Sequence, residues 1–215
     1  MSLTLYFHPL SSFCQKALIA LYENDVPFAP HIVNLFDEAS AATFKKIWPI
    51  GRFPVLRDEA RDRTVPESSI IIEYLAQHYP GPSPLIPLDP DIARQMRLRD
   101  RFFDLYVNVP VGKVVTDRLR PPGRNDPHGV EEAKALPRIS LGMIEQDMAK
   151  KSWAMGDSFT MADCAAAPAL FYADKVMSFG ETYKHVADYL ARLKARPSYA
   201  RALGEAKPYL KLMPN

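Results

Sequence analysis

Cysteine is scarce in this 215-residue sequence, which contains only Cys14 and Cys164. So few thiols in a chain of this length suit a reducing compartment, with a single disulfide between the two as the alternative. The N-terminal segment MSLTLYFHPL lacks a basic region followed by an apolar one and therefore predicts no signal peptide. The longest apolar stretch, CAAAPALFYA, is too short to span a bilayer and contains Pro168. We therefore expect a cytoplasmic protein with no membrane partner.

The sequence also lacks the signatures of several other functional classes. Its formal net charge is +2 and it has no long run of Lys or Arg, which argues against a nucleic-acid partner. It has no glycine-rich phosphate loop and no G-x-S-x-G nucleophile motif. None of the histidines has the spacing typical of zinc ligands, so we expect no metal; they are His8, His31, His78, His128 and His185.

The first 80 residues show short apolar runs typical of strands, alternating with segments of helical periodicity. The order of these segments is βαβαββα, which predicts a compact α/β unit. Because a helix separates the first two strands, we expect them to pair in parallel. Strands are expected at 3–7, at 28–35, from near Pro54 and at 64–65, and helices at 12–24, 38–47 and 68–78.

The pattern changes at YPGPSPLIPLDPD, residues 79–91, where proline is too frequent for a helix interior or a central strand. We place a linker at 81–90, between an α/β domain at 1–80 and a helical domain at 91–215. An apolar stripe predicts that one helix carries Leu98, Phe102, Leu105, Tyr106 and Val109 on a single face. Further helices are expected near 130–151, 161–177, 183–195 and 197–206.

The junction between the first strand and the first helix reads SSFC, from Ser11 to Cys14. A thiol redox fold would place Cys-x-x-Cys at such a junction, but serine stands at the first position. This hydroxyl is either the N-cap of the helix or a donor aimed at an anion.

Two further segments are typical of a ligand site, although each also has a plainer explanation. In RFPV, Pro54 begins a strand, and an X-Pro bond in the cis form turns backbone groups outward toward a peptide-like ligand. In PESSI, Glu67 and Ser68 open a helix whose first turn has free N–H groups that favour a carboxylate. The plainer explanations are an edge-strand proline and an ordinary helix cap.

The segment FTMADC in the second half predicts a structural motif. Thr160 and Asp163 have the spacing of a capping box, with Phe159 at the position before the cap. We expect Asp163 to stabilise the helix start and to lie away from any chemistry. Cys164 is expected to be a small buried core residue.

Taken in this order, these segments resemble the cytosolic glutathione S-transferase superfamily over nearly the whole chain. Members of that family pair a thioredoxin-like βαβαββα domain with an all-helical second domain. The proline-rich linker, the cis-proline segment, the Glu-Ser helix start and the FTMAD capping box all fall where the family has them. The resemblance therefore implies a thioredoxin-like glutathione-binding domain followed by a helical domain.

The opening LYFHPLSSFCQKALIAL is similar to the serine-type classes, such as theta, delta and zeta. The resemblance implies that Ser11 activates the thiol of glutathione, with Ser12 as the alternative because adjacent serines leave the register open. The chain departs from the family at Phe13, where many members have Pro, and at Gln15, where many have Arg. Trp48 replaces a frequent Asn. These departures leave the class open.

The resemblance also assigns residues to the rest of glutathione. Glu67 and Ser68 resemble the pair that holds its γ-glutamyl end. Phe53 matches the residue before the cis-proline, Pro54, whose backbone pairs with the cysteinyl part. Arg52 stands where many members have Lys, near the glycyl carboxylate.

The implied activity is conjugation of the glutathione thiolate to a small hydrophobic electrophile, in a homodimer. We expect the acceptor pocket to lie between the domains and to involve Leu10, Phe13 and side chains of the first long helix, Tyr106 foremost. An isomerase or dehalogenase on the same site is one alternative, and a non-catalytic glutathione-binding scaffold is another. Retention of the serine and Glu-Ser motifs argues against the scaffold. A glutaredoxin-like role through Cys14 is disfavoured because the nucleophilic position holds Ser11.

Overall fold

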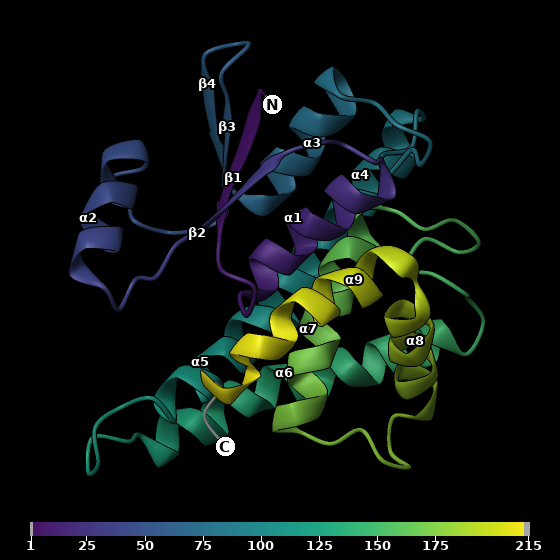
Figure 1. The fold of residues 1–215 in the computed structure, drawn as a ribbon. Helices are drawn as coiled ribbons and strands as arrows, with labels where there is room; N and C mark the ends of the chain where they lie inside the picture. The colour runs from purple at the N-terminus through teal and green to yellow at the C-terminus, as the bar shows by residue number, and fades with distance from the viewer. Residues whose placement is uncertain (1, 213–215) are drawn as a thin grey trace.

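The computed structural model describes residues 2–212 and places a four-stranded mixed sheet in the first half of the chain (Figure 1). The strand order is β2-β1-β3-β4. β1 pairs with β2 in parallel and with β3 in antiparallel fashion, and β3 pairs with β4 in antiparallel fashion. The predicted βαβαββα order and parallel first pair are confirmed. The strands are β1 (Leu3–Phe7), β2 (Ala29–Ile32), β3 (Val55–Asp58) and β4 (Arg63–Pro66).

Helices cover both faces of this sheet. Figure 1 shows α2 (Glu38–Ile47) on one side and α1 (Ser12–Glu23) with α3 (Ser68–His78) on the other. Strand alternation in β1 separates the faces: Tyr6 packs toward the α2 side, in a small cluster with Phe44 and neighbouring apolar residues. The buried side chains on the opposite face of β1 join the main core; they are Leu3, Leu5 and Phe7.

The second half of the chain is helical. Residues 79–89 connect α3 to it without a helix or strand, and the last residue of the expected linker, Pro90, is already the first residue of α4. The exact domain boundaries stay a prediction, and their ends at residues 1 and 213–215 lie outside the described residues. The elements are α4 (Pro90–Phe102), a π-helical turn (Phe103–Asn108), α5 (Val109–Asp117), α6 (Pro127–Met148), α7 (Met161–Val176), α8 (Lys184–Ala195), α9 (Pro197–Ala206) and a 3₁₀ turn (Lys207–Leu212).

Two elements differ from the expectation. The second strand ends at Ile32 rather than at residue 35, because β1 itself ends at Phe7: the Val33 N–H still donates to the Phe7 carbonyl, and beyond it the strand has no partner. The expected long helix is interrupted by the π-helical turn, which separates α4 from α5. Within residues 2–212, no helix combines the length and apolar composition needed to cross a membrane.

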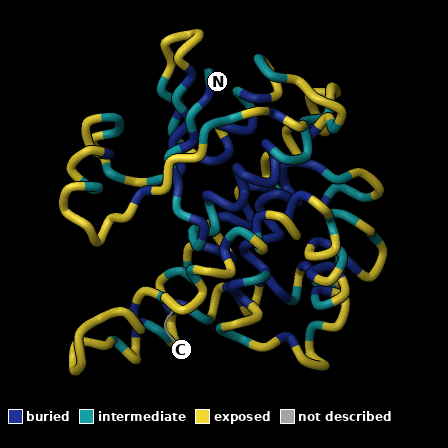
Figure 2. Tube along the Cα trace, viewed as in Figure 1, coloured by how far each residue is buried: buried dark blue, intermediate teal, exposed yellow. Residues whose placement is uncertain are grey.

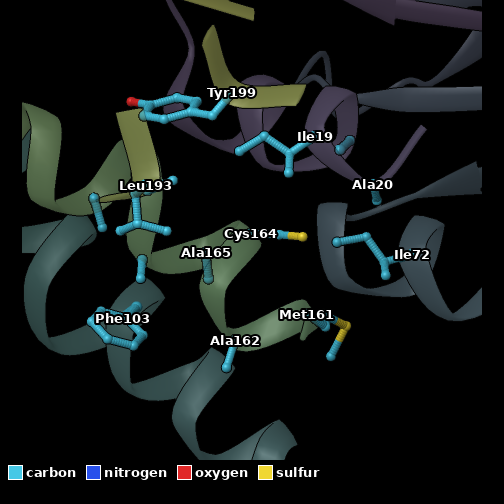
Figure 3. Close-up of a cluster of buried hydrophobic side chains, with 14 of the residues drawn as sticks. Ile19, Ala20, Ile72, Phe103, Met161, Ala162, Cys164, Ala165, Leu193 and Tyr199 are labelled. Atoms are coloured by element: carbon cyan, nitrogen blue, oxygen red, sulfur yellow. The ribbon is translucent and has the colours of Figure 1, made fainter. Parts of the chain in front are cut away.

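A single hydrophobic core joins the two halves. Helix α7 runs through its centre and presents small side chains, which let α1 and the π-helical turn approach closely. Figure 2 shows the buried residues gathered where these helices meet, and Figure 3 shows side chains of both halves packed around Cys164. Cys164 is fully buried, as predicted for a small core residue. The labelled members of the cluster in Figure 3 include Ile19, Ala20, Ile72, Phe103, Ala165 and Tyr199.

The predicted capping box is present at the start of α7. The Asp163 carboxylate accepts hydrogen bonds from the Thr160 N–H at 2.8 Å, the Thr160 hydroxyl at 3.1 Å and the Ala154 N–H at 2.8 Å. It also accepts one from the Tyr189 hydroxyl at 2.5 Å. Burial raises the pKa of Asp163, against the lowering effect of these donors. The carboxylate therefore ties α7 both to the preceding loop and to α8.

Candidate functional site

A cleft of about 280 Å³ lies where the α/β half meets the π-helical turn. The α/β half contributes the start of α1, the segment before β3 and the start of α3. The helical half contributes side chains from the end of α4, from the π-helical turn and from the start of α5. The lining residues are Phe13, Arg52, Phe53, Pro54, Glu67, Ser68, Arg101, Asp104, Leu105 and Val109. Five of the predicted site residues, Arg52 to Pro54 with Glu67 and Ser68, therefore share one cleft.

The segment before β3 enters the cleft through a cis peptide bond between Phe53 and Pro54. The Phe53 ring packs near the rings of Phe44 and His8, at centroid distances of 6.4 Å and 6.2 Å. These contacts anchor the side chain of Phe53 in the α/β half. The position of the cis bond agrees with the one that the sequence comparison to the family implies.

The start of α3 has an unusual backbone. Glu67 is the N-cap with φ +70°, a conformation that non-glycine residues adopt rarely and that costs of the order of 1–3 kcal/mol. Ser68 is the first helical residue and its side chain is almost fully buried, whereas Glu67 is exposed. A strained backbone at a helix N-terminus that opens into a cleft is typical of a site that holds an anion.

Ser11 and Ser12 lie at the start of α1, beside the cleft but not among its lining residues. Ser11 is the N-cap, and its hydroxyl oxygen accepts a hydrogen bond from the Cys14 N–H at 3.4 Å. A hydroxyl has one hydrogen and two lone pairs, so this contact leaves the Ser11 hydrogen free to donate. Helix α7 anchors the loop before α1, because the Tyr172 hydroxyl donates a hydrogen bond to the Leu10 carbonyl at 2.5 Å.

Cys14 is fully buried and forms no disulfide. Burial raises the pKa of its thiol to about 12, against smaller lowering effects of Ser11 and His8. The thiolate is the nucleophilic form of cysteine, and at neutral pH Cys14 is protonated. Cys14 is therefore packed inside the molecule, away from the cleft lining.

Arg101 and Asp104 are cleft residues that escaped the sequence analysis, whereas Leu105 and Val109 belong to the long helix whose side chains were expected at the acceptor pocket. All come from the helical half. The predicted apolar stripe splits at the π-helical turn, so that Leu105 and Val109 face the cleft. Tyr106, which we expected to be foremost in the acceptor pocket, instead lines a groove between α4 and α6, together with other members of the stripe, Leu98 and Phe102. The extra residue in a π turn shifts the register of the side chains that follow.

Behind the cleft, charged side chains cross the boundary between the halves. The Lys16 ammonium of α1 contacts Asp100 at 2.6 Å and Asp104 at 2.7 Å, and all three side chains are at least 96% buried. Ser69 donates to Asp100 at 2.8 Å and accepts from Lys16 at 2.8 Å. Burial raises the pKa of Asp104, against the lowering effect of Lys16. The spacing of Asp100 and Asp104, one helical turn apart, is a sequence signal that could have indicated this cluster, but the sequence analysis did not use it.

Residues 2–212 contain no cluster of three or more His, Cys, Asp or Glu side chains placed to hold a metal ion. What the cleft offers chemically is a set of charges of both signs around two helix starts. Arg52 and Arg101 are positive, whereas Glu67 and Asp104 are negative. Apolar side chains, Leu105 among them, form its remaining wall.

Two protein-family models match the chain: the glutathione S-transferase N-terminal domain at residues 5–83 and the glutathione S-transferase C-terminal domain at residues 140–192. Together they match more than half of the sequence. Among curated proteins, a stringent starvation protein A homolog of Histophilus somni is 26% identical and the match covers 96% of this chain and 92% of that protein. A glutathione S-transferase of Hyoscyamus muticus is also 26% identical, over 94% of this chain and 98% of its own.

Among solved structures, a glutathione S-transferase of Methylobacterium radiotolerans in complex with glutathione sulfonate is 27% identical. The match covers 93% of each chain with a TM-score of 0.81. The likeness extends over both halves of the molecule and confirms the thioredoxin-like first half followed by helices.

Proposed function

The chain belongs to the glutathione S-transferase superfamily, and we propose that it binds reduced glutathione in the cleft and transfers the thiolate to a small hydrophobic electrophile. The observation that carries this proposal is the convergence of Phe53, Glu67 and Ser68 on one cleft beside the Ser11 helix start. The relative from Methylobacterium radiotolerans, whose structure contains glutathione sulfonate, supports glutathione as the ligand.

We orient glutathione in the cleft by matching its charged groups to the charges of the lining residues. Its γ-glutamyl end lies at the start of α3, where Ser68 and the helix N-terminus favour a carboxylate. Its cysteinyl part pairs with the backbone of Phe53, next to the cis-proline. Its glycyl carboxylate is placed toward the positive charge of Arg52.

The chemical step requires the glutathione thiol to be ionised. A free thiol has a pKa of about 8.5, so little thiolate exists at neutral pH. Lowering that pKa by about two units requires about 2.7 kcal/mol of differential stabilisation. A hydrogen bond from Ser11 to the sulfur and the positive end of α1 supply about that much. The Cys14 N–H contact polarises the Ser11 hydroxyl and strengthens its donation.

The acceptor is proposed to lie against Phe13, Leu105 and Val109, of which the last two are about half exposed. These side chains form an apolar wall with no ionisable group, which favours a hydrophobic electrophile over a charged one. Isomerisation or dehalogenation would use the same thiolate. Glutathione conjugation assays over a panel of electrophiles, including halogenated compounds and cis-enoic diketo acids, test the proposal and separate these reactions.

A non-catalytic glutathione-binding protein is the second candidate. It is favoured by the relative named stringent starvation protein A homolog, which matches 96% of this chain and bears no transferase name. If the wild-type protein binds glutathione but conjugates none of the panel, the second candidate replaces the first.

Binding through the start of α3 is tested by removing the hydroxyl of Ser68. We expect Ser68→Ala to weaken glutathione binding by about 1–2 kcal/mol, because it removes a hydrogen bond to a charged group. Glu67→Ala is expected to weaken binding as well. Titration calorimetry measures both, and unchanged affinity in the two variants would contradict the placement of the γ-glutamyl end.

We also propose that the protein is a homodimer, as the family resemblance implies. The groove between α4 and α6 measures about 620 Å³, and three apolar side chains beside it are half exposed or more: Leu98, Ile139 and Met143. Exposed apolar surface of this kind marks an interaction site. The groove is the surface that the second copy is proposed to cover.

If a second copy covers this groove, introducing a charge there should lower the molar mass of the protein in solution from that of a dimer to that of a monomer. We expect Ile139→Asp to convert the protein to a monomer, since a carboxylate would be buried without a partner. Leu119→Asp, at an exposed leucine after α5, is the matched control and should stay dimeric. Light scattering coupled to size-exclusion chromatography gives the masses; a wild-type monomer, or a dimeric Ile139→Asp, rules the interface out.

A further inference from the structure

The turn between β1 and α1 carries Ser11, and short-range hydrogen bonds set much of its shape. The Ser11 N–H donates to the His8 carbonyl at 3.0 Å, and the Leu10 N–H donates to Nδ1 of His8 at 3.3 Å. The Gln15 N–H then donates to the Ser11 carbonyl at 2.9 Å, as in a regular first helical turn. All of these bonds lie within residues 8–15, so they set the conformation of the turn but not its place in the molecule.

Two buried side chains hold the remaining carbonyls of the turn, those of Pro9 and Leu10. Nε2 of Gln15 donates to the Pro9 carbonyl at 2.9 Å, and the Tyr172 hydroxyl donates to the Leu10 carbonyl at 2.5 Å. Gln15 is fully buried and Tyr172 nearly so. Tyr172 lies on α7, 162 positions along the chain from Leu10, so its bond ties the turn to the helical half.

Tyr172 is a donor over the whole pH range in which a thiol ionises. Burial raises the pKa of its hydroxyl, against a smaller lowering effect of the Gln15 side chain beside it. The phenol is therefore neutral when glutathione changes from thiol to thiolate. Neither Tyr172 nor Gln15 lines the cleft, so any influence that they have on bound glutathione passes through the turn.

The Ser11 side chain itself has only a weak local restraint. Its oxygen accepts from the Cys14 N–H at 3.4 Å, which is long for a hydrogen bond. The place of the hydroxyl therefore depends on where the turn holds the Ser11 backbone. A hydrogen bond weakens steeply as its geometry departs from the optimum, and a catalytic group must be held within about 0.5 Å of its productive position.

We infer that Tyr172 is a positioning residue for thiol activation: assisted by Gln15, it holds the Leu10–Ser11 peptide where the Ser11 hydroxyl reaches the glutathione sulfur. This inference rests on the proposed function and deepens it, because it makes the activating step depend on α7, whose residues do not line the cleft. Tyr172 keeps its own proton throughout. It therefore acts through Ser11 and takes no part in proton transfer.

Tyr172→Phe removes this one hydroxyl and keeps the ring that packs in the core. We expect it to raise the pKa of the bound glutathione thiol by about one unit, half of the shift proposed for activation, because the Ser11 hydrogen bond is misaligned but not lost. As a result, kcat/KM at neutral pH should fall by about threefold and recover as the pH rises. Ultraviolet titration of the bound thiolate and the pH profile of kcat/KM measure the shift. The affinity for glutathione well below the thiol pKa, measured by calorimetry, should not change.

A double-mutant cycle with Ser11 distinguishes positioning from a general loosening of the fold. In the Ser11→Ala background, Tyr172→Phe should raise the thiol pKa no further, since the hydroxyl that it positions is gone. The matched control is Tyr189→Phe, which removes another buried tyrosine hydroxyl with a 2.5 Å bond, here to Asp163 at the start of α7. It should lower the melting temperature but leave the thiol pKa at the wild-type value.

The outcomes separate this inference from the proposed function. If the wild-type protein binds no glutathione, the proposed function fails and the inference fails with it. If Ser11→Ala raises the thiol pKa but Tyr172→Phe does not, or does so equally in the Ser11→Ala background, only the inference is overturned. An unchanged pKa in Ser11→Ala also overturns it, while conjugation of glutathione keeps the proposed function. Should Tyr172→Phe fail to fold, Gln15→Met, which removes the donor to the Pro9 carbonyl, takes its place in the cycle, and no rise of the thiol pKa there overturns the inference.

Discussion

Replacing Ser11 with alanine is expected to lower kcat/KM for glutathione conjugation at neutral pH by roughly 20-fold. The reason is the thiol pKa: if the Ser11 hydroxyl lowers it by about two units, its removal leaves only a few per cent of bound glutathione as thiolate. The pH profile of kcat/KM is the measurement, because the variant should regain activity as the pH rises toward the pKa of a free thiol.

Two companion variants decide which residue acts. Cys14→Ser should keep the wild-type pH profile, because the Cys14 thiol is buried with a pKa of about 12 and has no access to the reaction. Ser12→Ala should be nearly silent. If Ser12→Ala alone shifts the profile, the mechanism stands with the neighbouring hydroxyl. A wild-type profile in Ser11→Ala together with an inactive Cys14→Ser would refute the serine mechanism. Ser11 is also the N-cap of α1, so its loss should lower the free energy of unfolding by about 1 kcal/mol. This loss of stability does not change the pKa that the pH profile measures.

Asp163→Ala should lower the free energy of unfolding by about 3 kcal/mol or more. The spacing Thr160-x-x-Asp163 by itself predicts about 1 kcal/mol, the usual effect of a helix cap. The structure raises that expectation, because the fully buried carboxylate accepts hydrogen bonds from Thr160, Ala154 and Tyr189, and its loss leaves those donors unpaired. A decrease of about 6–12 °C in melting temperature follows for a chain of this length.

Calorimetric and denaturant unfolding measure the effect, with Asp157→Ala as the control. Asp157 lies in the same loop but is exposed, so its loss should change stability by less than about 0.5 kcal/mol. Conjugation by folded Asp163→Ala should stay normal well below its melting temperature. A variant that melts like the wild type but no longer conjugates would show that Asp163 has a role in the chemistry instead.

The elements predicted best from sequence are those whose ends are set by local chemistry. The helices at 68–78 and 197–206 have the predicted bounds, since a serine or proline at the start and a break at the end act within one turn. The same holds for the residues of the α/β half that line the cleft. Arg52, Phe53 and Pro54 are adjacent in sequence, and Glu67 and Ser68 follow one hairpin later, so their proximity needs only the pairing of β3 with β4.

The other wall of the cleft could not be predicted in this way. Arg101 and Asp104 reach it only because α4 and the π-helical turn pack against α7, and the Lys16 ion pairs hold their acids to α1, which depends on the whole core. The apolar stripe from Leu98 to Val109 was assigned a single α-helical period, because no residue type is diagnostic of a π-helical turn. Tyr106 was therefore assigned to the wrong side, although its apolar character was read correctly.

The shared core around α7 bears on how this architecture can be recombined. The two family models match separate segments of the chain, which suggests that the two halves could be exchanged between family members as independent domains. In the folded molecule, however, Ile19 of α1 and Ala165 of α7 belong to one packed cluster, and Lys16 closes an ion network with the acids of α4. A chimera that took its first half from another family member would inherit a foreign α1 surface and a void or clash against α7. Function should therefore be transferred between such proteins by substituting residues that line the cleft, while the residues that pack α1 against α7 are kept unchanged.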